Sequence, residues 1–187
     1  VNLVFLTVAI AMIVERTIRV FFQYSIDARS FMAQIQKLIL ANNIDRGIKL
    51  CNAAPSALLA RVIRAGLTVS NRGAREVSRA LEETVLEVTP LIAKRTPLLW
   101  SMANISTLIG LVGTIVGLIG TFRSLAAASP ELKQVMLSKG ISEAMNNTAF
   151  GLIIAVTCIV AHMILNNKTK ATIEEMEYQA LRLENML

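Results

Sequence analysis

Three stretches of the sequence contain no Lys, Arg, Asp or Glu, and they divide the chain into membrane and polar parts. They cover residues 1–14, 98–122 and 144–167. A helix that crosses a bilayer needs about 20 mostly apolar residues. The second and third stretches are long enough, and the first is short. Because the sequence begins at Val1 without a methionine, we expect the first span to be cut at its start.

The competing interpretation of the first stretch is a cleavable signal peptide, whose apolar region is about 7–15 residues long. The sequence fits it poorly, because no basic segment precedes the apolar run. Glu15, Arg16 and Arg19 follow it in place of a small-residue cleavage site. We therefore interpret residues 1–14 as a truncated first transmembrane helix.

The polar segments have helical periodicity. We expect helices at 30–40, 44–53 and 57–67, the last capped by Ser56, and a longer helix from Ala74. No loop separates this longer helix from the apolar stretch at 98–122, so we expect it to continue into the membrane, with Pro90 and Pro97 as possible kinks. Its apolar positions recur three and four residues apart and predict one buried stripe: Val77, Leu81, Val85, Val88 and Ile92.

The C-terminal tail at 168–187 continues the third span in the same way. Its predicted buried side contains Ile173, Met176, Ala180, Leu183 and Leu187. No strand pattern is visible. The sequence thus predicts an all-α membrane protein with three transmembrane helices and long cytoplasmic helical extensions.

The distribution of basic residues predicts the orientation. Residues 15–97 hold 13 of the 19 Lys and Arg residues, and the connection at 123–143 holds three. Because basic flanks resist translocation, residues 15–97 and 168–187 are expected in the cytoplasm, and the N-terminus and the connection outside. The expected segments are therefore 1–14, 15–97, 98–122, 123–143, 144–167 and 168–187. This topology accounts for the net charge of +6, so nucleic-acid binding is not predicted.

The composition excludes several other classes of function. With 54% hydrophobic and 17% charged residues, the chain is unlike an average soluble domain. Cys51 and Cys158 are far apart and form no metal-binding or redox motif. A single histidine, no phosphate-binding loop and no nucleophile–base pair leave no material for catalysis. We therefore predict no enzyme activity, no cofactor, no metal site and no catalytic residue.

The second span has one face of small residues and beside it a line of hydroxyls. Its glycines fall within an arc of about 80° and are Gly110, Gly113, Gly117 and Gly120. Such residues let neighbouring helices pack closely in lipid. Thr107, Thr114 and Thr121 recur every seven residues. They could bond to their own helix, or they could form hydroxyl girdles around a pore if several copies made a ring.

The third span begins with a dense polar run. Glu143 and Asn147 share a face, and Gly151 and His162 follow on a similar side. Such groups usually face a bundle interior or a wet cavity. The alternatives are that Glu143 reaches the outer headgroups, that Asn147 bonds between helices and that His162 is an interfacial residue. No ionisable residue lies at mid-depth in either span, so a proton relay would need a carboxylate from a partner.

Two motifs resemble the paired signatures of the MotA/TolQ/ExbB proton channel family. They are ANISTLIGLVGTI at 103–115 and GISEAMNNTAFGL at 140–152. Further likeness lies in Val14-Glu15-Arg16 and in the segment from Pro55-Ser56 to Gly66-Leu67. The size, the three spans and the short tail resemble the ExbB/TolQ branch.

The resemblance implies a bacterial inner-membrane stator subunit of an ion-driven motor. In such a complex a homo-oligomeric ring, generally of five copies, encloses an ExbD- or TolR-like single-span partner that brings a membrane aspartate. Motion is then passed to a TonB- or TolA-like protein or to a motility apparatus. The family's partner-facing threonines match Thr114 and Thr148 here, and its acidic residue early in the third span matches Glu143.

The sequence departs from the commonest family pattern in ways that make the lining more polar. Ser106-Thr107 replaces Ala-Pro, Asn146-Asn147 replaces small or apolar residues, and Thr157 stands where a proline is frequent. Proton against sodium, and the driven process, therefore stay open. Two other hypotheses are an oligomeric scaffold without an ion path and an electrostatic scaffold that recruits partners through its basic loop, including Arg61 and Arg64.

Overall fold

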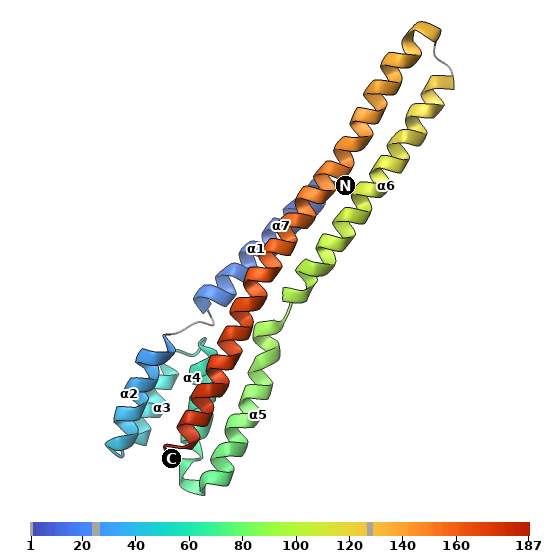
Figure 1. Cartoon of the computed structure of the whole chain (residues 1–187). Helices are drawn as coiled ribbons and strands as arrows, with labels where there is room; N and C mark the ends of the chain where they lie inside the picture. The colour runs from blue at the N-terminus through green and yellow to red at the C-terminus, as the bar shows by residue number, and fades with distance from the viewer. Residues whose placement is uncertain (1, 24–26, 127–128) are drawn as a thin grey trace. The chain divides into compact units, whose positions relative to one another are not determined.

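The computed structural model describes residues 2–23, 27–126 and 129–187. Val1 and residues 127–128, which belong to the predicted first span and external connection, lie outside this description. All regular elements of the described residues are helical (Figure 1). They are α1 (Asn2–Ile18), η1 (Arg19–Gln23), α2 (Ala28–Leu40), α3 (Ile44–Asn52), α4 (Leu58–Thr68), η2 (Ser70–Arg72), α5 (Ala74–Ala93), α6 (Thr96–Ala126) and α7 (Pro130–Glu184).

The helices form two compact units. Unit 1 comprises Val1–Glu15 and Arg95–Ile164, and unit 2 comprises Arg16–Lys94 and Leu165–Leu187. The helix α7 is 55 residues long, so it contains the predicted third span and residues 168–184 of the predicted C-terminal helix. It also contains residues 130–143 of the predicted external connection.

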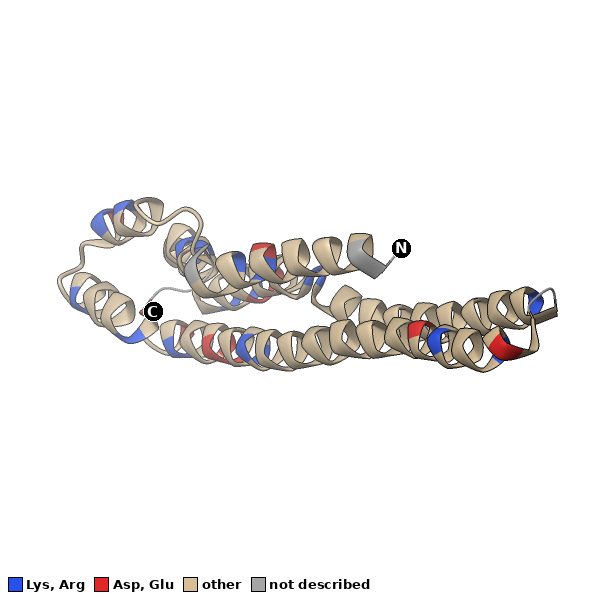
Figure 2. Cartoon of the chain, turned by 90° about the horizontal axis from the view of Figure 1, so that it is seen from above, with Lys and Arg blue, Asp and Glu red and all other residues tan. Residues whose placement is uncertain are grey.

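Two helical runs among the described residues are long and apolar enough to cross a membrane. They are Ala74–Ala126 and Pro130–Glu184, with mean hydropathies of 2.0 and 2.3 in their most apolar windows. Only 11% and 28% of those windows are buried, whereas the core helix of a soluble protein is mostly buried. The middle of α7 carries no Lys, Arg, Asp or Glu, as Figure 2 shows. These apolar surfaces therefore face outwards, as lipid or a partner helix requires.

The core of unit 2 is built around α4. Most of its residues are buried, including Leu59, Val62 and Ile63. A Cβ added at Gly66 would lie 2.8 Å from Leu81 Cδ2 and 3.1 Å from Leu183 Cδ2, so α4 approaches α5 and α7 closely. Each large side chain buried in this way contributes about 1.5–3 kcal/mol. This apolar core holds the short helices together.

The predicted stripes account for the faces that α5 and α7 give to this core. Val77, Leu81, Val88 and Ile92 are buried, and Val85 packs against them. On α7, Met176, Ala180 and Leu183 are buried and Ile173 is partly buried. The prediction for Leu187 was wrong: this residue is 40% exposed because α7 ends at Glu184.

A side chain caps the start of α2, but none caps the start of α4. Asp27 caps α2 by accepting hydrogen bonds from the backbone N–H groups of Arg29 and Ser30. The predicted Ser56 cap is wrong: α4 begins after Ala57, and no side chain caps it.

The predicted helix from α5 into the second span is interrupted close to the predicted kink at Pro97. Lys94 and Arg95 separate α5 from α6, and Arg95 has a φ of 67°. Proline lacks an N–H and restricts the residue before it, so Pro97 favours a new helix start at this point.

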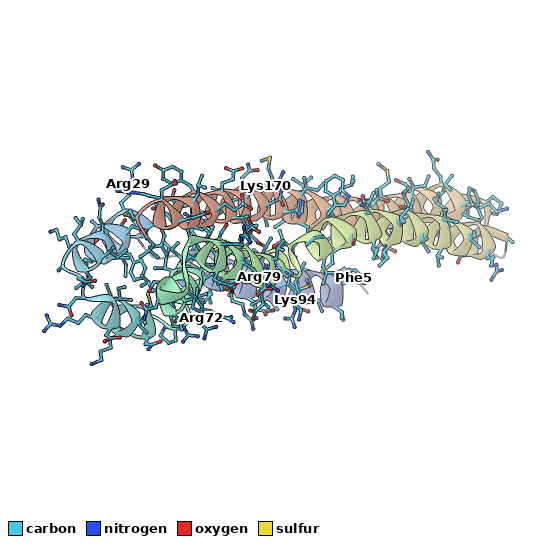
Figure 3. The ribbon with its side chains drawn as sticks, turned by 90° about the horizontal axis from the view of Figure 1, so that it is seen from below. Phe5, Arg29, Arg72, Arg79, Lys94 and Lys170 are labelled. Carbon is cyan, nitrogen blue, oxygen red and sulfur yellow. The ribbon has the colours of Figure 1, made fainter. Side chains whose placement is uncertain are left out.

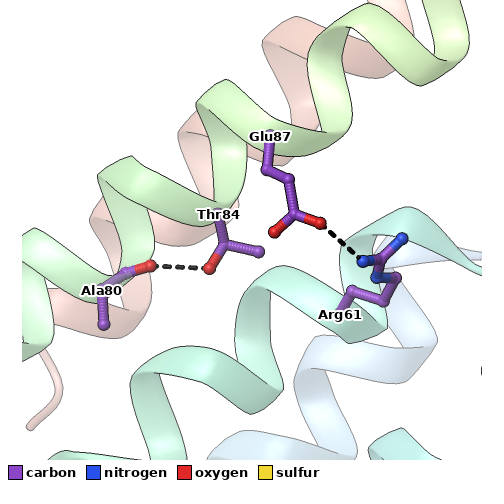
Figure 4. A network of polar contacts seen from close by, with 4 residues as sticks. All are labelled: Arg61, Ala80, Thr84 and Glu87. Atoms are coloured by element: carbon purple, nitrogen blue, oxygen red, sulfur yellow. Dashed lines mark hydrogen bonds and ion pairs between the residues drawn. The ribbon is translucent and has the colours of Figure 1, made fainter.

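Polar contacts stabilise the end of each unit near the break. In unit 2 the buried Arg16 guanidinium donates to the Ile92 carbonyl at 2.6 Å, so a cation meets the C-terminal turn of α5. In unit 1 Arg95 pairs with Glu15 at 2.8 Å. On the surface of unit 2, Arg61 pairs with Glu87 at 3.0 Å, and Thr84 donates to the Ala80 carbonyl (Figure 4). An exposed ion pair such as Arg61–Glu87 contributes about 0–1 kcal/mol.

Burial makes the Cys51 thiol unreactive. Desolvation raises its pKa to about 11, although the nearby Arg64 charge opposes the shift. The thiolate is the nucleophile, so at pH 8 little of the reactive form exists. The pKa of the Cys51 thiol is higher in the folded than in the unfolded chain. The stability of the fold therefore falls as the pH rises above about 9, where the unfolded thiol begins to ionise.

We predict that Cys51 and Cys158 resist maleimide at pH 8 in the native protein and react after denaturation, since both are buried. Mass spectrometry of the labelled chain measures this. An Asn71→Cys variant, with an exposed thiol at η2, is the positive control. Rapid labelling of native Cys51 would contradict the packing of unit 2.

Candidate functional site

The candidate site in unit 1 is the seam where α6 and α7 meet. Their backbones approach most closely at Gly110 and Gly151. A Cβ added at Gly151 would lie 2.8 Å from the Ser106 carbonyl oxygen and 2.9 Å from the Gly110 Cα. A Cβ added at Gly110 would lie 3.3 Å from the Thr148 Cα. Only residues without a side chain allow this contact.

The other predicted packing glycines occupy different surroundings. A Cβ at Gly113 would lie 3.1 Å from Asn147 Cβ, and one at Gly117 would lie 3.1 Å from Ala144 Cβ. Gly120 has open space where a Cβ would stand. The α7 helix of the same chain thus covers most of the glycine face. Gly140 was not among the predicted packing glycines. Its missing side chain makes room for Thr121.

The hydroxyls of Thr114 and Thr148 meet across the seam. Their Oγ1 atoms form a hydrogen bond in which either can donate. Thr114 Oγ1 also lies 3.2 Å from the Gly110 carbonyl oxygen and 3.3 Å from that of Ala144, and Thr148 Oγ1 lies 3.1 Å from the Gly110 carbonyl. Each hydroxyl has one proton and several acceptors, so the pair can exchange donor directions without moving the helices.

Thr107 and Thr121 continue the line but bond within α6. Thr107 donates to the Ala103 carbonyl at 3.2 Å, and Thr121 donates to the Gly117 carbonyl at 2.9 Å. All four threonines are half-buried. The side of the seam that carries these threonines therefore presents partly accessible hydroxyl groups.

Glu143 and Asn147 are exposed on α7. The Glu143 carboxylate lies 4.0 Å from Lys139 Nζ, one turn earlier, and its side chain is 70% exposed. Glu143 and Lys139 line a hollow of about 420 Å³ together with Gly120, Thr121 and Ser124. The hollow places a carboxylate, an ammonium group and hydroxyls at one end of the threonine line.

Two polar contacts of the seam were missing from the predicted site. Ser106 is buried and donates to the Gly151 carbonyl at 3.1 Å. His162 Nδ1 lies 3.0 Å from the Thr96 carbonyl oxygen, which can only accept, so Nδ1 carries the proton. The Trp100 ring lies beside His162, with centroids 6.0 Å apart. Ser106 follows Ala103 by three residues on the α7-facing side, which is the signal that could have identified it.

No cluster of three or more His, Cys, Asp or Glu residues that could hold a metal ion occurs in the part of the chain that the structure describes. Between Glu143 and Lys168, the only titratable groups on α7 are Cys158 and His162. Between these two residues the seam thus offers hydroxyls and carbonyls but no carboxylate.

A family comparison identifies this arrangement. Residues 54–178 match the model of the MotA/TolQ/ExbB proton channel family. The chain belongs to this family. A comparison with curated proteins gives no match. The matched region contains the α6–α7 seam and part of unit 2, and the family is one of membrane proton channels in stator- and motor-type complexes.

We predict that Gly151→Ala destabilises the protein by about 1–3 kcal/mol, because its Cβ would collide with the backbone of α6. Thermal unfolding in detergent, followed by circular dichroism, measures the change. The matched control is Gly120→Ala, which adds the same atom in open space and gains about 1 kcal/mol of helix propensity. Equal unfolding temperatures for the two variants would contradict the close packing.

Proposed function

We propose that the chain is the ring-forming stator subunit of an ion-driven motor in the bacterial inner membrane. The observation that carries this proposal is the Thr114–Thr148 hydroxyl pair, which lies between two apolar helices with no carboxylate at its depth. Paired hydroxyls can hydrate and orient a passing proton but cannot store its charge. The proton-storing group then comes from a second protein.

The partner is an ExbD- or TolR-like protein with one span and a membrane aspartate. A ring of copies, generally five, surrounds it. The exposed apolar side chains of α6 and α7, such as Ile115 and Ile153, supply the surfaces for neighbours and lipid. Moving one charge through 100 mV releases about 2.3 kcal/mol, which is the energy available for each ion. The ring passes the resulting motion to a TonB- or TolA-like protein or to a gliding apparatus.

We propose that α1 is the first of three spans, before those of α6 and α7. In unit 1 Ala9 of α1 is buried against Ala103 of α6 and against Ile154, Ala155 and Cys158 of α7. Its other side leaves Val4, Val8 and Val14 exposed, as lipid contact requires. With the basic residues on the cytoplasmic side, the N-terminus is periplasmic and the C-terminus cytoplasmic.

A second candidate is an oligomeric scaffold without an ion path. The hydroxyls of Thr107 and Thr121 favour it, because each is satisfied on its own helix. In this reading the threonine line is packing surface.

Substitution of Thr148 separates the two candidates. We predict that Thr148→Val, which keeps the shape and removes the hydroxyl, lowers ion flux by about tenfold or more, the loss that 1.4 kcal/mol of barrier produces. The complex is purified from its host with its partner and reconstituted into liposomes. A proton dye and a sodium dye then report the flux and identify the ion.

The matched control is Thr157→Val on the same helix. Thr157 is exposed and donates to the Ile153 carbonyl at 2.8 Å, and it lies nine residues from Thr148, on the opposite face of α7. The complex with Thr157→Val should conduct ions normally. Normal flux through an assembled Thr148→Val complex would favour the scaffold.

A further inference from the structure

Unit 2 has an apolar groove with an acidic rim between α5 and the end of α7. Its volume is about 390 Å³. Val85, Leu86 and Leu181 contribute apolar surface, and Leu86 and Leu181 are 75% and 59% exposed. Its charged lining residues are Glu82, Glu177 and Glu184. Leucine side chains that are exposed to this extent beside a hollow are typical of a contact surface.

The opposite kind of surface lies at the turn between α2 and α3. Leu40, the last residue of α2, is 80% exposed. The helices α2 and α3 carry four basic residues, Arg29, Lys37, Arg46 and Lys49, and one acidic residue, Asp45. Lys37 precedes Leu40 by one turn, and Arg46 lies in the first turn of α3. Figure 3 shows the Arg29 side chain of α2 at the outer edge of the helices.

We propose that the basic turn of one copy, with Leu40 at its centre, docks into the acidic groove of the next copy. Charge argues for this occupant, because the groove repels a second groove and attracts the basic turn. The contact therefore joins two different patches. A contact of this heterologous kind closes into a ring when its rotation closes.

The two patches of unit 2 lie at the same height along α7, as this contact requires. Arg182 of α7 bonds to Gln36 of α2 at 2.9 Å, so the last turns of α2 lie level with residue 182. Residues 177–184 of α7 line the groove at the same level. Copies inserted alike in one membrane lie at equal depth, so patches that are to meet must share a level.

The two patches also lie on different flanks of α7. With about 100° per residue, Arg182 and the pair Glu177 and Leu181 lie on opposite sides of the buried stripe. Since Arg182 contacts α2, the groove is on the flank turned away from α2. Leu40 therefore reaches the groove of a neighbour, and chains can continue around a ring. That the ring closes rests on the proposed function.

Disulfide cross-linking in native membranes tests the contact. In a full-length Cys51→Ser and Cys158→Ala background, Leu40→Cys with Leu181→Cys should give a ladder of multimers on oxidation. Either cysteine alone should leave the chain monomeric on a denaturing gel. The control pair Leu40→Cys with Asn71→Cys, at the exposed η2 turn, should give no ladder.

Charge reversal gives a second readout. Glu177→Lys with Glu184→Lys should lower the cross-linked fraction by about tenfold, the effect of 1.4 kcal/mol. Adding Lys37→Glu and Arg46→Glu in the same chain should restore it. Loss without restoration would contradict the charge complementarity.

The remaining outcomes separate this proposal from the stator function. A Leu40→Cys dimer would show an isologous contact, and a link confined to one chain would place both residues in the same copy; either overturns the proposal. A copurifying small molecule in the groove, detected by native mass spectrometry, would overturn it too. If native mass spectrometry shows a ring that conducts ions but forms no ladder, the docking is wrong and the stator function stands. A chain that stays monomeric would contradict both.

Discussion

The contact between Gly110 and Gly151 is the constraint on which unit 1 depends. In lipid, helices gain little from apolar burial against each other, so they associate through close packing and hydrogen bonds. The missing side chains let α6 and α7 come close enough for Thr148 to reach the Gly110 carbonyl and for Ser106 to reach that of Gly151. A wider separation would remove these bonds together. The same glycines therefore determine both the packing and the position of the hydroxyl pair.

The fold of unit 2 could be predicted from the sequence to the extent that periodicity records burial. The stripe from Val77 to Ile92 met the core as expected, because each of its positions packs against a neighbouring helix. The break at Lys94–Arg95 was predictable only in part. Pro97 marked a possible kink, but no glycine marks the left-handed backbone position that Arg95 occupies.

The candidate site was predictable in composition but not in its pairing. The spacing of the glycines indicated a helix-packing face, yet spacing does not tell which helix covers it. The structure gives most of that face to α7 of the same chain and leaves Gly120 open. Gly140 and Ser106 act through α6–α7 contacts. Spacing can put Ser106 on the same side as Ala103, but the pattern of one helix does not show which group of the other helix it meets.

In the proposed stator subunit, the two units take on separate tasks. Unit 1 has few charges along its seam, so an ion that follows the proposed path there meets neutral dipoles whose orientation can follow it. Unit 2 concentrates charge, with basic residues on α2 and α3 and carboxylates on α5 and the end of α7. The proposed contact between copies relies on this charge. Charged groups lose less solvation in water than in lipid, so the proposal assigns this contact to unit 2 and not to unit 1.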